Sequence, residues 1–438
     1  MNKKLKVLMI GLNVQDNVFP LSLTYLSSFA KKYHNDVDFI IKEFSFGSRQ
    51  SIDTNKSLEQ RIASYILLKN PDLVSFSAYI WNIELIRSIS KIVKNLNSKI
   101  KILVGGVEIG ESSNYLLKDR SVDYLMLGEG EIGLKELISY LKGEIAIDKV
   151  SSISYFNKGK IIKNKKQIVE DLDNLPFPYD WNVAEKPSDE YSTVRIETIR
   201  GCNFSCSYCY YSQVKVRRFS IDYLERNIPK LFENYKFKNL TILDANINVD
   251  KKRMKKVFDI INECVKKYGR RISLHIELKP ELIDKDVIDI LANNSFQVSA
   301  ELGLQSTDPA VLNDCARPYS LDKVSEGLAL LNASNIRYKI DLMYGLPSDN
   351  FYKFLSSVCF ILKNSNQRNV VAHHFMNLNN TPLFENPKDI KRLNKNNSSM
   401  VISNGSENVI DFHNSKLFLE MINNESKMCK GENLLTRK

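Results

Sequence analysis

Cysteine is scarce in this chain and absent from its first 201 residues. Seven cysteines occur among 438 residues, an odd number without the spacing of a disulfide framework. This pattern argues against a secreted domain held together by disulfides. We therefore expect a protein of the reducing cytoplasm.

The sequence also lacks long hydrophobic runs. No stretch of eighteen or more apolar residues occurs, so no transmembrane helix and no membrane partner are expected. The short apolar run at residues 7–10 follows lysines at positions 3, 4 and 6, but it is brief and has no small-residue cleavage site after it. We interpret this run as a first β-strand and not as a signal peptide.

Positive charge is in excess but is not concentrated. The net charge is +11, yet no block of five or six basic residues occurs. No RNA- or DNA-binding motif accompanies the charge, so nucleic acid is not an expected partner. With 43% hydrophobic and 26% charged residues, the composition is that of a globular protein, and 438 residues suggest two or three domains.

The N-terminal third alternates between two hydrophobic periods. Continuous apolar runs predict strands, and apolar residues at helical spacing predict helices between them. The predicted strands lie at 4–10, 37–44, 71–79, 99–106 and 122–131, and the helices at 21–33, 57–70, 82–97 and 132–143. This α/β pattern predicts a doubly wound, Rossmann-like parallel sheet over residues 1–145, which would bind ligands at the carboxyl ends of its strands.

The rest of the chain predicts a second α/β unit. Residues 146–190 read as a proline-containing linker with a small hairpin. Six strand–helix units over residues 191–380 predict a partial (β/α)6 barrel, with its chemistry at the carboxyl ends of the strands. Residues 381–438 are rich in Asn, Ser and Lys and weakly patterned, so we expect a small, partly disordered C-terminal extension.

Three of the seven cysteines lie within eight residues, just after the first predicted strand of the second unit. They are Cys202, Cys206 and Cys209 in the segment RGCNFSCSYC. A structural zinc site normally takes four ligands, and no fourth Cys or His lies nearby in the sequence. Three thiolates on a short loop suit an iron–sulfur cluster that keeps one iron open. Zinc and an accidental spacing are the alternatives.

This spacing, with Tyr208 before the last cysteine, resembles the signature of radical S-adenosylmethionine (SAM) enzymes. Other segments resemble the subfamily that joins an N-terminal cobalamin-binding domain to a radical SAM barrel: GEGE at 128–131, LPFPYD at 175–180, LGLQS at 302–306 and YGLPSD at 344–349. The resemblance covers about residues 5–385. Methylthiotransferases share the barrel but carry a second cluster on N-terminal cysteines, which residues 1–201 lack.

The resemblance implies three cofactors: a [4Fe–4S] cluster, SAM and cobalamin. It implies that the three cysteines ligate the cluster, and that the other cofactor contacts in the barrel come from Asp244, Asn246, Glu277, Glu301, Gln305 and Gly345. In the N-terminal domain the candidates are Ser77, Gly105, Gly106, Glu108, Gly128, Glu129 and Gly130. No D-x-H-x-x-G follows the first strand, so cobalamin would not be held through a histidine there. A scaffold that binds no cobalamin is the alternative.

The activity implied is a cobalamin-dependent C-methylation. A 5′-deoxyadenosyl radical would act on an unactivated carbon of a peptide or other natural-product precursor, with a flavodoxin or ferredoxin as electron donor. One alternative is a cyclisation, rearrangement or epimerisation without methyl transfer, for which Cys315 is the candidate catalytic hydrogen donor. Another is a non-catalytic cobalamin or cluster sensor.

Overall fold

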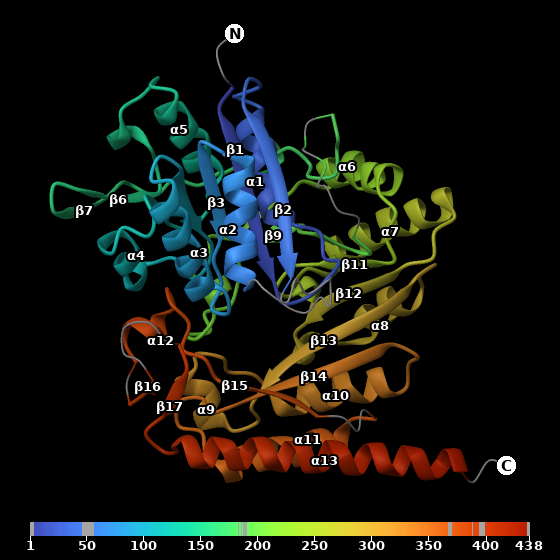
Figure 1. Cartoon of the computed structure of the whole chain (residues 1–438). Coiled ribbons are helices and arrows are strands. Elements are labelled where there is room, and N and C mark those ends of the chain that lie inside the picture. Colours follow the sequence, from blue (N-terminus) through green and yellow to red (C-terminus); the bar gives the residue numbers. More distant parts are fainter. Residues whose placement is uncertain are drawn as a thin grey trace. The chain divides into compact units, whose positions relative to one another are not determined.

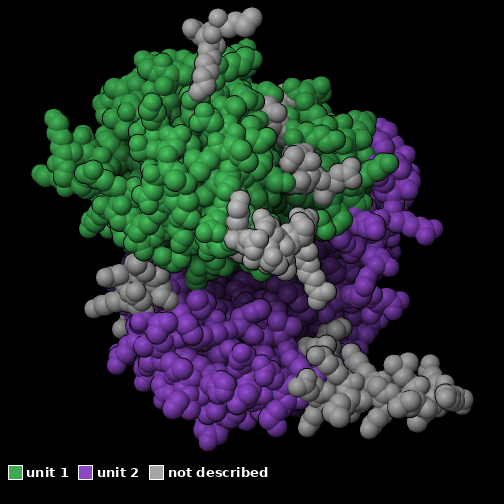
Figure 2. Space-filling view, in the orientation of Figure 1, with its two compact units in different colours: residues 1–195, 217–237 green, residues 196–216, 238–438 purple. Residues whose placement is uncertain are grey.

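The computed structural model describes residues 4–45, 57–182, 184, 186, 191–366, 370–387, 389–393 and 399–435. The chain divides into two compact units (Figure 2). The first contains residues 1–195 and 217–237, and the second contains residues 196–216 and 238–438. None of the helices within the described ranges is long and apolar enough to cross a membrane.

The first unit is built on a seven-stranded sheet with the order β2-β1-β3-β4-β5-β6-β7 (Figure 1). The five strands β1 to β5 pair in parallel, in the order expected of a doubly wound sheet. Their bounds are β1 Lys6–Asn13, β2 Asp38–Ser45, β3 Leu73–Ser77, β4 Lys101–Gly105 and β5 Tyr124–Met126. The predicted parallel sheet is confirmed.

The predicted hairpin extends this sheet. β6 (Ile153–Asn157) pairs antiparallel with β5, and β7 (Lys160–Lys163) pairs antiparallel with β6. The sheet therefore contains both parallel and antiparallel pairs. A short turn is enough to join β6 to β7, because antiparallel strands, unlike parallel ones, need no crossover helix between them. The sequence pattern predicted the hairpin itself, but it did not predict that the hairpin pairs with β5.

Helices cover both faces of the sheet because its strands are apolar on both sides. Leu8 and Ile10 of β1 face one apolar core, to which α2, α3 and α4 contribute. Val7 and Met9 face the other core, to which α1 and α5 contribute. These helices are α1 Leu21–Lys31, α2 Leu58–Lys69, α3 Ile83–Leu96, α4 Tyr115–Lys118 and α5 Glu131–Leu141. The first unit also contains α6 Ile221–Asn234.

The second unit is built on a six-stranded sheet with the order β15-β14-β13-β12-β11-β8, of which only residues 193–195 of the edge strand β8 are counted with the first unit. Neighbours along the sheet follow each other in the chain, and the pairs from β11 to β15 are parallel, as in a partial barrel. The strands are β8 Thr193–Ile196, β11 Asn239–Ile242, β12 Ser273–Leu278, β13 Gln297–Gln305, β14 Arg337–Tyr344 and β15 Val371–His374. The predicted partial barrel is confirmed.

Helices and short strands complete the second unit. The helices are α7 Lys251–Tyr268, α8 Lys285–Ala292, α9 Pro309–Asp314, α10 Leu321–Asn332, α11 Phe351–Asn364, α12 Pro382–Glu385 and α13 Val409–Leu435, and β16 Lys391–Arg392 pairs with β17 Val401–Ser403. The weakly patterned C-terminal extension thus contains a long helix. The disorder predicted there falls in part on residues 388, 394–398 and 436–438, which lie outside the described residues.

Candidate functional site

The three cysteines lie on one loop that begins where β9 (Ile199–Arg200) ends. Gly201 opens the loop with φ +84°, and a Cβ there would collide with the carbonyl oxygen of Val214, so only glycine fits this turn. Cys206 is buried, while Cys202 and Cys209 are partly exposed. The Ser212 hydroxyl lies 2.9 Å from the Cys206 carbonyl oxygen and 2.7 Å from that of Cys209, so it donates within the loop.

Two N–H donors from other elements reach the cysteine sulfurs. Asn246 Nδ2 lies 3.4 Å from Cys202 Sγ, and Arg317 Nη1 lies 3.5 Å from Cys206 Sγ. Arg317 also donates to the carbonyl oxygen of Gly303 and is only 8% exposed. Hydrogen bonds to thiolate sulfur stabilise a metal–sulfur centre and tune its potential. Asn246 is a predicted site residue, whereas sequence reasoning missed Arg317.

A cavity of about 160 Å³ opens in front of this loop. Its lining brings the predicted cluster ligands together with four other predicted site residues: Asn246, Glu277, Glu301 and Gln305. Among the described residues, no three His, Cys, Asp or Glu side chains gather closely enough to hold a single metal ion. The fit to a cluster therefore depends on the loop itself, whose three cysteines line one cavity and which has N–H donors at the sulfurs of Cys202 and Cys206.

Asp244 holds the chain that leads into the cysteine loop. Its carboxylate accepts from the backbone N–H of Thr198 at 2.7 Å and of Ile199 at 3.0 Å, and from the Thr198 hydroxyl. Burial raises the pKa of Asp244, although these hydrogen bonds oppose the shift. Asp244 does not belong to the cavity lining. The structure thus gives this predicted cofactor contact a positioning task.

A group of ionisable side chains lies inside the barrel, on three adjacent strands. Glu301 of β13 lies 3.4 Å from the imidazole of His275 and 2.7 Å from the ammonium of Lys339. The hydrogen bond from His275 is the largest cause that lowers the pKa of Glu301. Burial raises the pKa of Asp341 to about 8, and that of Glu277 to about 7 although its carboxylate opens onto the cavity. Asp341 therefore holds a proton at neutral pH beside ionised Glu301.

Two other predicted site residues do not line the cavity. Cys315 is 1% exposed, and its carbonyl oxygen accepts from the Ser207 N–H at 2.9 Å. Gly345 is buried beside the Phe412 ring of α13. The catalytic role of Cys315 and the cofactor contact of Gly345 stay predictions, and neither is supported by a place in the cavity.

In the first unit, several predicted residues gather at the carboxyl ends of β3 and β4. The Ser77 carbonyl accepts from Asn82 Nδ2 at 3.1 Å, and the Gly105 carbonyl accepts from the Ala78 N–H at 2.7 Å. Gly106 has φ +108°, and a Cβ there would collide with the Ala78 carbonyl oxygen. These two strand ends therefore pack backbone to backbone, and Asn82, which sequence reasoning missed, bridges β3 to the Leu12 carbonyl at the end of β1.

The remaining predicted residues of this unit differ in their surroundings. Glu108 is buried, at 6% exposure. Gly128 is exposed with φ +81° and has open space where a Cβ would lie, while Gly130 precedes α5 and sits against Leu26. Glu129 forms a buried ion pair with Arg217, so the structure gives this carboxylate a protein partner.

An aromatic pair stands beside these strand ends. The rings of Tyr79 and Trp81, which follow β3, stack with centroids 4.7 Å apart and planes 2° apart. Trp81 is 51% exposed. A flat apolar surface of this kind can receive a planar ligand.

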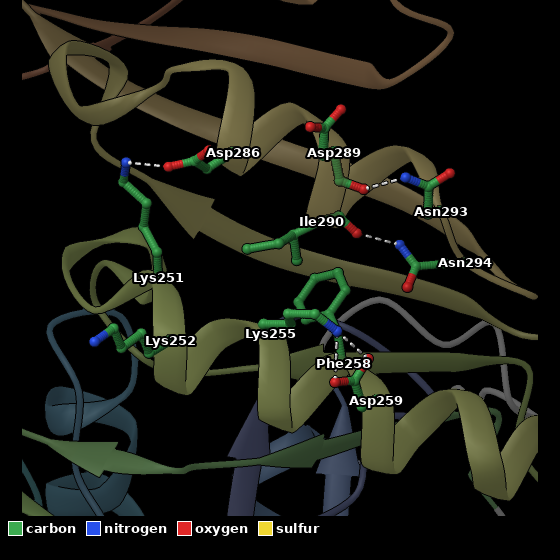
Figure 3. A pocket seen from close by; sticks show the side chains of 10 residues that line it. All are labelled: Lys251, Lys252, Lys255, Phe258, Asp259, Asp286, Asp289, Ile290, Asn293 and Asn294. Carbon is green, nitrogen blue, oxygen red and sulfur yellow. Dashed lines mark hydrogen bonds and ion pairs between the residues drawn. The ribbon is translucent and has the colours of Figure 1, made fainter.

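A larger hollow of about 470 Å³ lies between α7 and α8 (Figure 3). Phe258 and Ile290 contribute its apolar lining, and Lys251 reaches across it to Asp286 at 3.2 Å. None of the predicted site residues in the described part of the chain lines this hollow. The cavity at the cysteine loop is therefore the candidate active site.

Two protein-family models match this chain, each over a different part of it. The B12 binding domain model matches residues 7–138, and the Radical SAM superfamily model matches residues 196–357, which include the cysteine loop. The first match covers the five parallel strands of the first sheet but not its β6–β7 hairpin, and the second covers most of the barrel.

Curated relatives are similar at modest identity. The cobalamin-dependent radical SAM methyltransferase TokK of Streptomyces tokunonensis is 25% identical over 330 residues, covering 72% of this chain and 48% of TokK. An uncharacterized methyltransferase of Pyrococcus horikoshii, PH0819, is 24% identical over 302 residues, covering 67% of this chain and 62% of that protein. The chain thus spans about half to three fifths of the length of these relatives.

Solved structures share the fold. The radical SAM methyltransferase TsrM from Kitasatospora setae, with cobalamin and a [4Fe–4S] cluster bound, aligns with TM-score 0.64 and 13% identity, over 87% of this chain and 75% of that chain. The cobalamin-dependent radical enzyme OxsB, with aqua-cobalamin and SAM bound, aligns with TM-score 0.69 and 14% identity, over 94% of this chain and 65% of that chain. At these identities the likeness concerns the fold alone.

Proposed function

The chain belongs to the radical SAM enzymes that carry a B12 binding domain, and from this premise we propose that it transfers a methyl group to an unactivated carbon. We propose a peptide or other natural-product precursor as the substrate. The observation that carries the proposal is the loop of three cysteines, with N–H donors at two of its sulfurs and a cavity lined by polar residues in front of it.

The family's cofactors are a [4Fe–4S] cluster, SAM and cobalamin. When bound, they supply a 5′-deoxyadenosyl radical that removes a hydrogen atom from carbon, and a methyl group that replaces it. Cys202, Cys206 and Cys209 would hold the cluster. Asn246 and Arg317 orient two of the cysteine sulfurs through their N–H groups.

The cavity-facing polar residues would bind SAM. Glu277, Glu301 and Gln305 line the cavity with acceptors and an amide, which suit the hydroxyl and amino groups of such a ligand. Asp341, whose pKa burial raises to about 8, hydrogen-bonds to Glu301 and so helps to position this carboxylate in the cavity. These side chains would orient the cofactor and hold it in the cavity, while Asp244 fixes the chain that carries the cysteine loop.

Cobalamin would be held on the first unit. Ser77, Gly105, Gly106, Gly128 and Gly130 lie at the carboxyl ends of parallel strands or in the loops that follow, where such sheets bind ligands. The open space at Gly128 admits a close backbone approach, and the stacked rings of Tyr79 and Trp81 offer a flat surface nearby in the chain.

The reaction products test this function. Anaerobically reconstituted protein would receive a reductant, SAM and methylcobalamin, and mass spectrometry would follow 5′-deoxyadenosine and S-adenosylhomocysteine. We expect both products, and we expect Cys206→Ala to abolish 5′-deoxyadenosine formation because it removes a cluster ligand. Cys264→Ala, a buried cysteine of α7, is the matched control and should keep both products.

Other outcomes would overturn methyl transfer in defined ways. 5′-Deoxyadenosine without S-adenosylhomocysteine would indicate a cyclisation, rearrangement or epimerisation. Neither product from a chain with an intact cluster, tested with a panel of peptide and small-molecule substrates, would indicate a sensor. Cys315 lies outside the cavity lining, so no contact in the structure favours the epimerisation.

A further inference from the structure

A buried lysine lies under the cysteine loop. Lys279 directly follows β12 and is 3% exposed. Its Nζ lies 3.5 Å from the centroid of the Phe204 ring, in the loop segment between Cys202 and Cys206. Phe204 also lines the cavity at the cysteines. The ring therefore has a fixed cation among its contacts and belongs to the wall of the candidate active site.

The backbone around Lys279 is fixed from a second direction. Asn248 accepts from the Lys279 N–H at 3.0 Å and donates to the Lys279 carbonyl at 2.9 Å. Asn248 is itself 2% exposed. This pair of hydrogen bonds attaches the turn between β12 and the short helix Pro280–Leu282 to the short helix Ile247–Val249, and it holds the backbone from which the lysine side chain extends.

The charge of Lys279 is balanced by Glu281. Its Nζ lies 2.6 Å from Glu281 Oε1, and both side chains are largely buried. Among the described residues, the second carboxylate oxygen of Glu281 has no hydrogen-bond partner. A buried ion pair with an unsatisfied oxygen contributes little net stability, because desolvation offsets the attraction. A gain in folding stability therefore does not explain the ion pair between Lys279 and Glu281. The contact of Lys279 with the Phe204 ring of the cysteine loop does explain it.

We propose that Lys279 is a positioning residue for the iron–sulfur cluster: its ammonium, held by Glu281, packs on the Phe204 ring and fixes the loop segment between the first two cluster cysteines. This role needs only the cluster and does not depend on methyl transfer. A cation–π contact shielded from water is worth about 2 kcal/mol, equivalent to about 30-fold in an equilibrium.

The test compares cluster retention in matched variants. Phe204→Leu keeps an apolar side chain beside Lys279 but removes the aromatic ring face. Phe204→Tyr keeps an apolar side chain and an aromatic ring face. Lys279→Arg keeps the cation. The double variant Lys279→Met with Glu281→Leu removes the ion pair without leaving a charge buried alone. After anaerobic reconstitution, an iron chelator would be added, and the loss of the cluster's visible absorbance would be timed.

We expect Phe204→Leu and the double variant to lose the cluster about 10- to 30-fold faster than the wild type. Phe204→Tyr and Lys279→Arg should behave like the wild type. The EPR spectrum of the reduced cluster should change in the first two variants only, which a merely structural role would not produce. Thermal unfolding of the cluster-free chains checks that all variants fold.

Wild-type chelation rates and EPR spectra in both Phe204→Leu and the double variant would overturn the proposal. If Phe204→Leu fails to fold, the double variant decides the question. The rate of cluster loss and the EPR spectrum require neither methyl transfer nor cobalamin. They therefore still test the role of Lys279 if the proposed methylation fails.

Discussion

Arg317 illustrates at residue scale how the protein can set the properties of the cluster. Its guanidinium is buried and lies 3.5 Å from Cys206 Sγ. An N–H donor and a positive charge beside a cluster thiolate favour the more negative, reduced state and so raise the reduction potential. Sequence reasoning missed this residue because it lies 111 positions from Cys206, and only the bend of the barrel brings the two together.

We predict that Arg317→Met lowers the midpoint potential of the cluster. Loss of one charged hydrogen bond is expected to shift the potential of this one-electron couple by up to about 60–130 mV in the negative direction. Arg317→Lys retains the charge and should shift it less. A redox titration followed by EPR measures both variants, and identical potentials for wild type and Arg317→Met would contradict the role.

Asp341 links stability to pH. It is 7% exposed, and burial raises its pKa to about 8, far above its value in an unfolded chain. Between about pH 4 and pH 8 the folded state therefore keeps a proton that the unfolded state releases. The contribution of Asp341 to stability is present below about pH 4 and is lost as the pH rises toward 8.

We predict that Asp341→Asn removes this part of the pH dependence. The wild type should lose up to about 1.4 kcal/mol of unfolding free energy per pH unit between about pH 6 and pH 8 through this group, whereas the variant should lose less. Urea unfolding at both pH values measures the difference. Asp259→Asn, an exposed position on α7, is the control. Equal slopes in wild type and Asp341→Asn would refute this account.

At the scale of elements, the loops that end β3 and β4 depend on one glycine. Gly106 has φ +108°, and a side chain there would collide with the Ala78 carbonyl oxygen. Gly128 has φ +81° but faces open space. Its conformation is unfavourable for other residues, yet nothing blocks a methyl group there.

We predict that Gly106→Ala destabilises the protein by about 2 kcal/mol or more and weakens cobalamin binding. Gly128→Ala should cost about 1 kcal/mol, because it adds backbone strain without a collision. Urea unfolding and cobalamin titration of both variants test this difference. If Gly106→Ala is no less stable than Gly128→Ala, the close packing of the two loops does not constrain position 106.

Sequence patterns predicted the helices and strands better than the contacts between segments that are distant in sequence. The apolar runs identified the parallel strands of both units, because buried strands read as continuous hydrophobic segments. They did not show that the β6–β7 hairpin joins the first sheet, since register depends on contacts distant in sequence. They also did not show that Glu129, whose predicted cofactor contact stays a prediction, pairs with Arg217, 88 positions away.

At the scale of the whole molecule, the net charge of +11 bears on the electron donor. We propose an acidic flavodoxin or ferredoxin in this role, as its charge would complement a basic chain. Reduction of the cluster by such a protein should slow at least several-fold between about 50 mM and 500 mM salt, because salt screens the attraction. Reduction by dithionite, a small anion with no docking surface, is the control and should slow less than reduction by the protein donor. Rates with the protein donor that do not depend on salt would contradict electrostatic docking.

The central claim is that one chain holds two metal cofactors on separate residues. The measurement that tests it most directly is the iron and cobalt content of the same anaerobically reconstituted sample, for the wild type and for a variant with Cys202, Cys206 and Cys209 all changed to Ala. We predict about four iron atoms and about one cobalt atom per wild-type chain, and a variant that loses its iron but keeps its cobalt. Iron retained by the variant, or no cobalt in the wild type, would contradict the account.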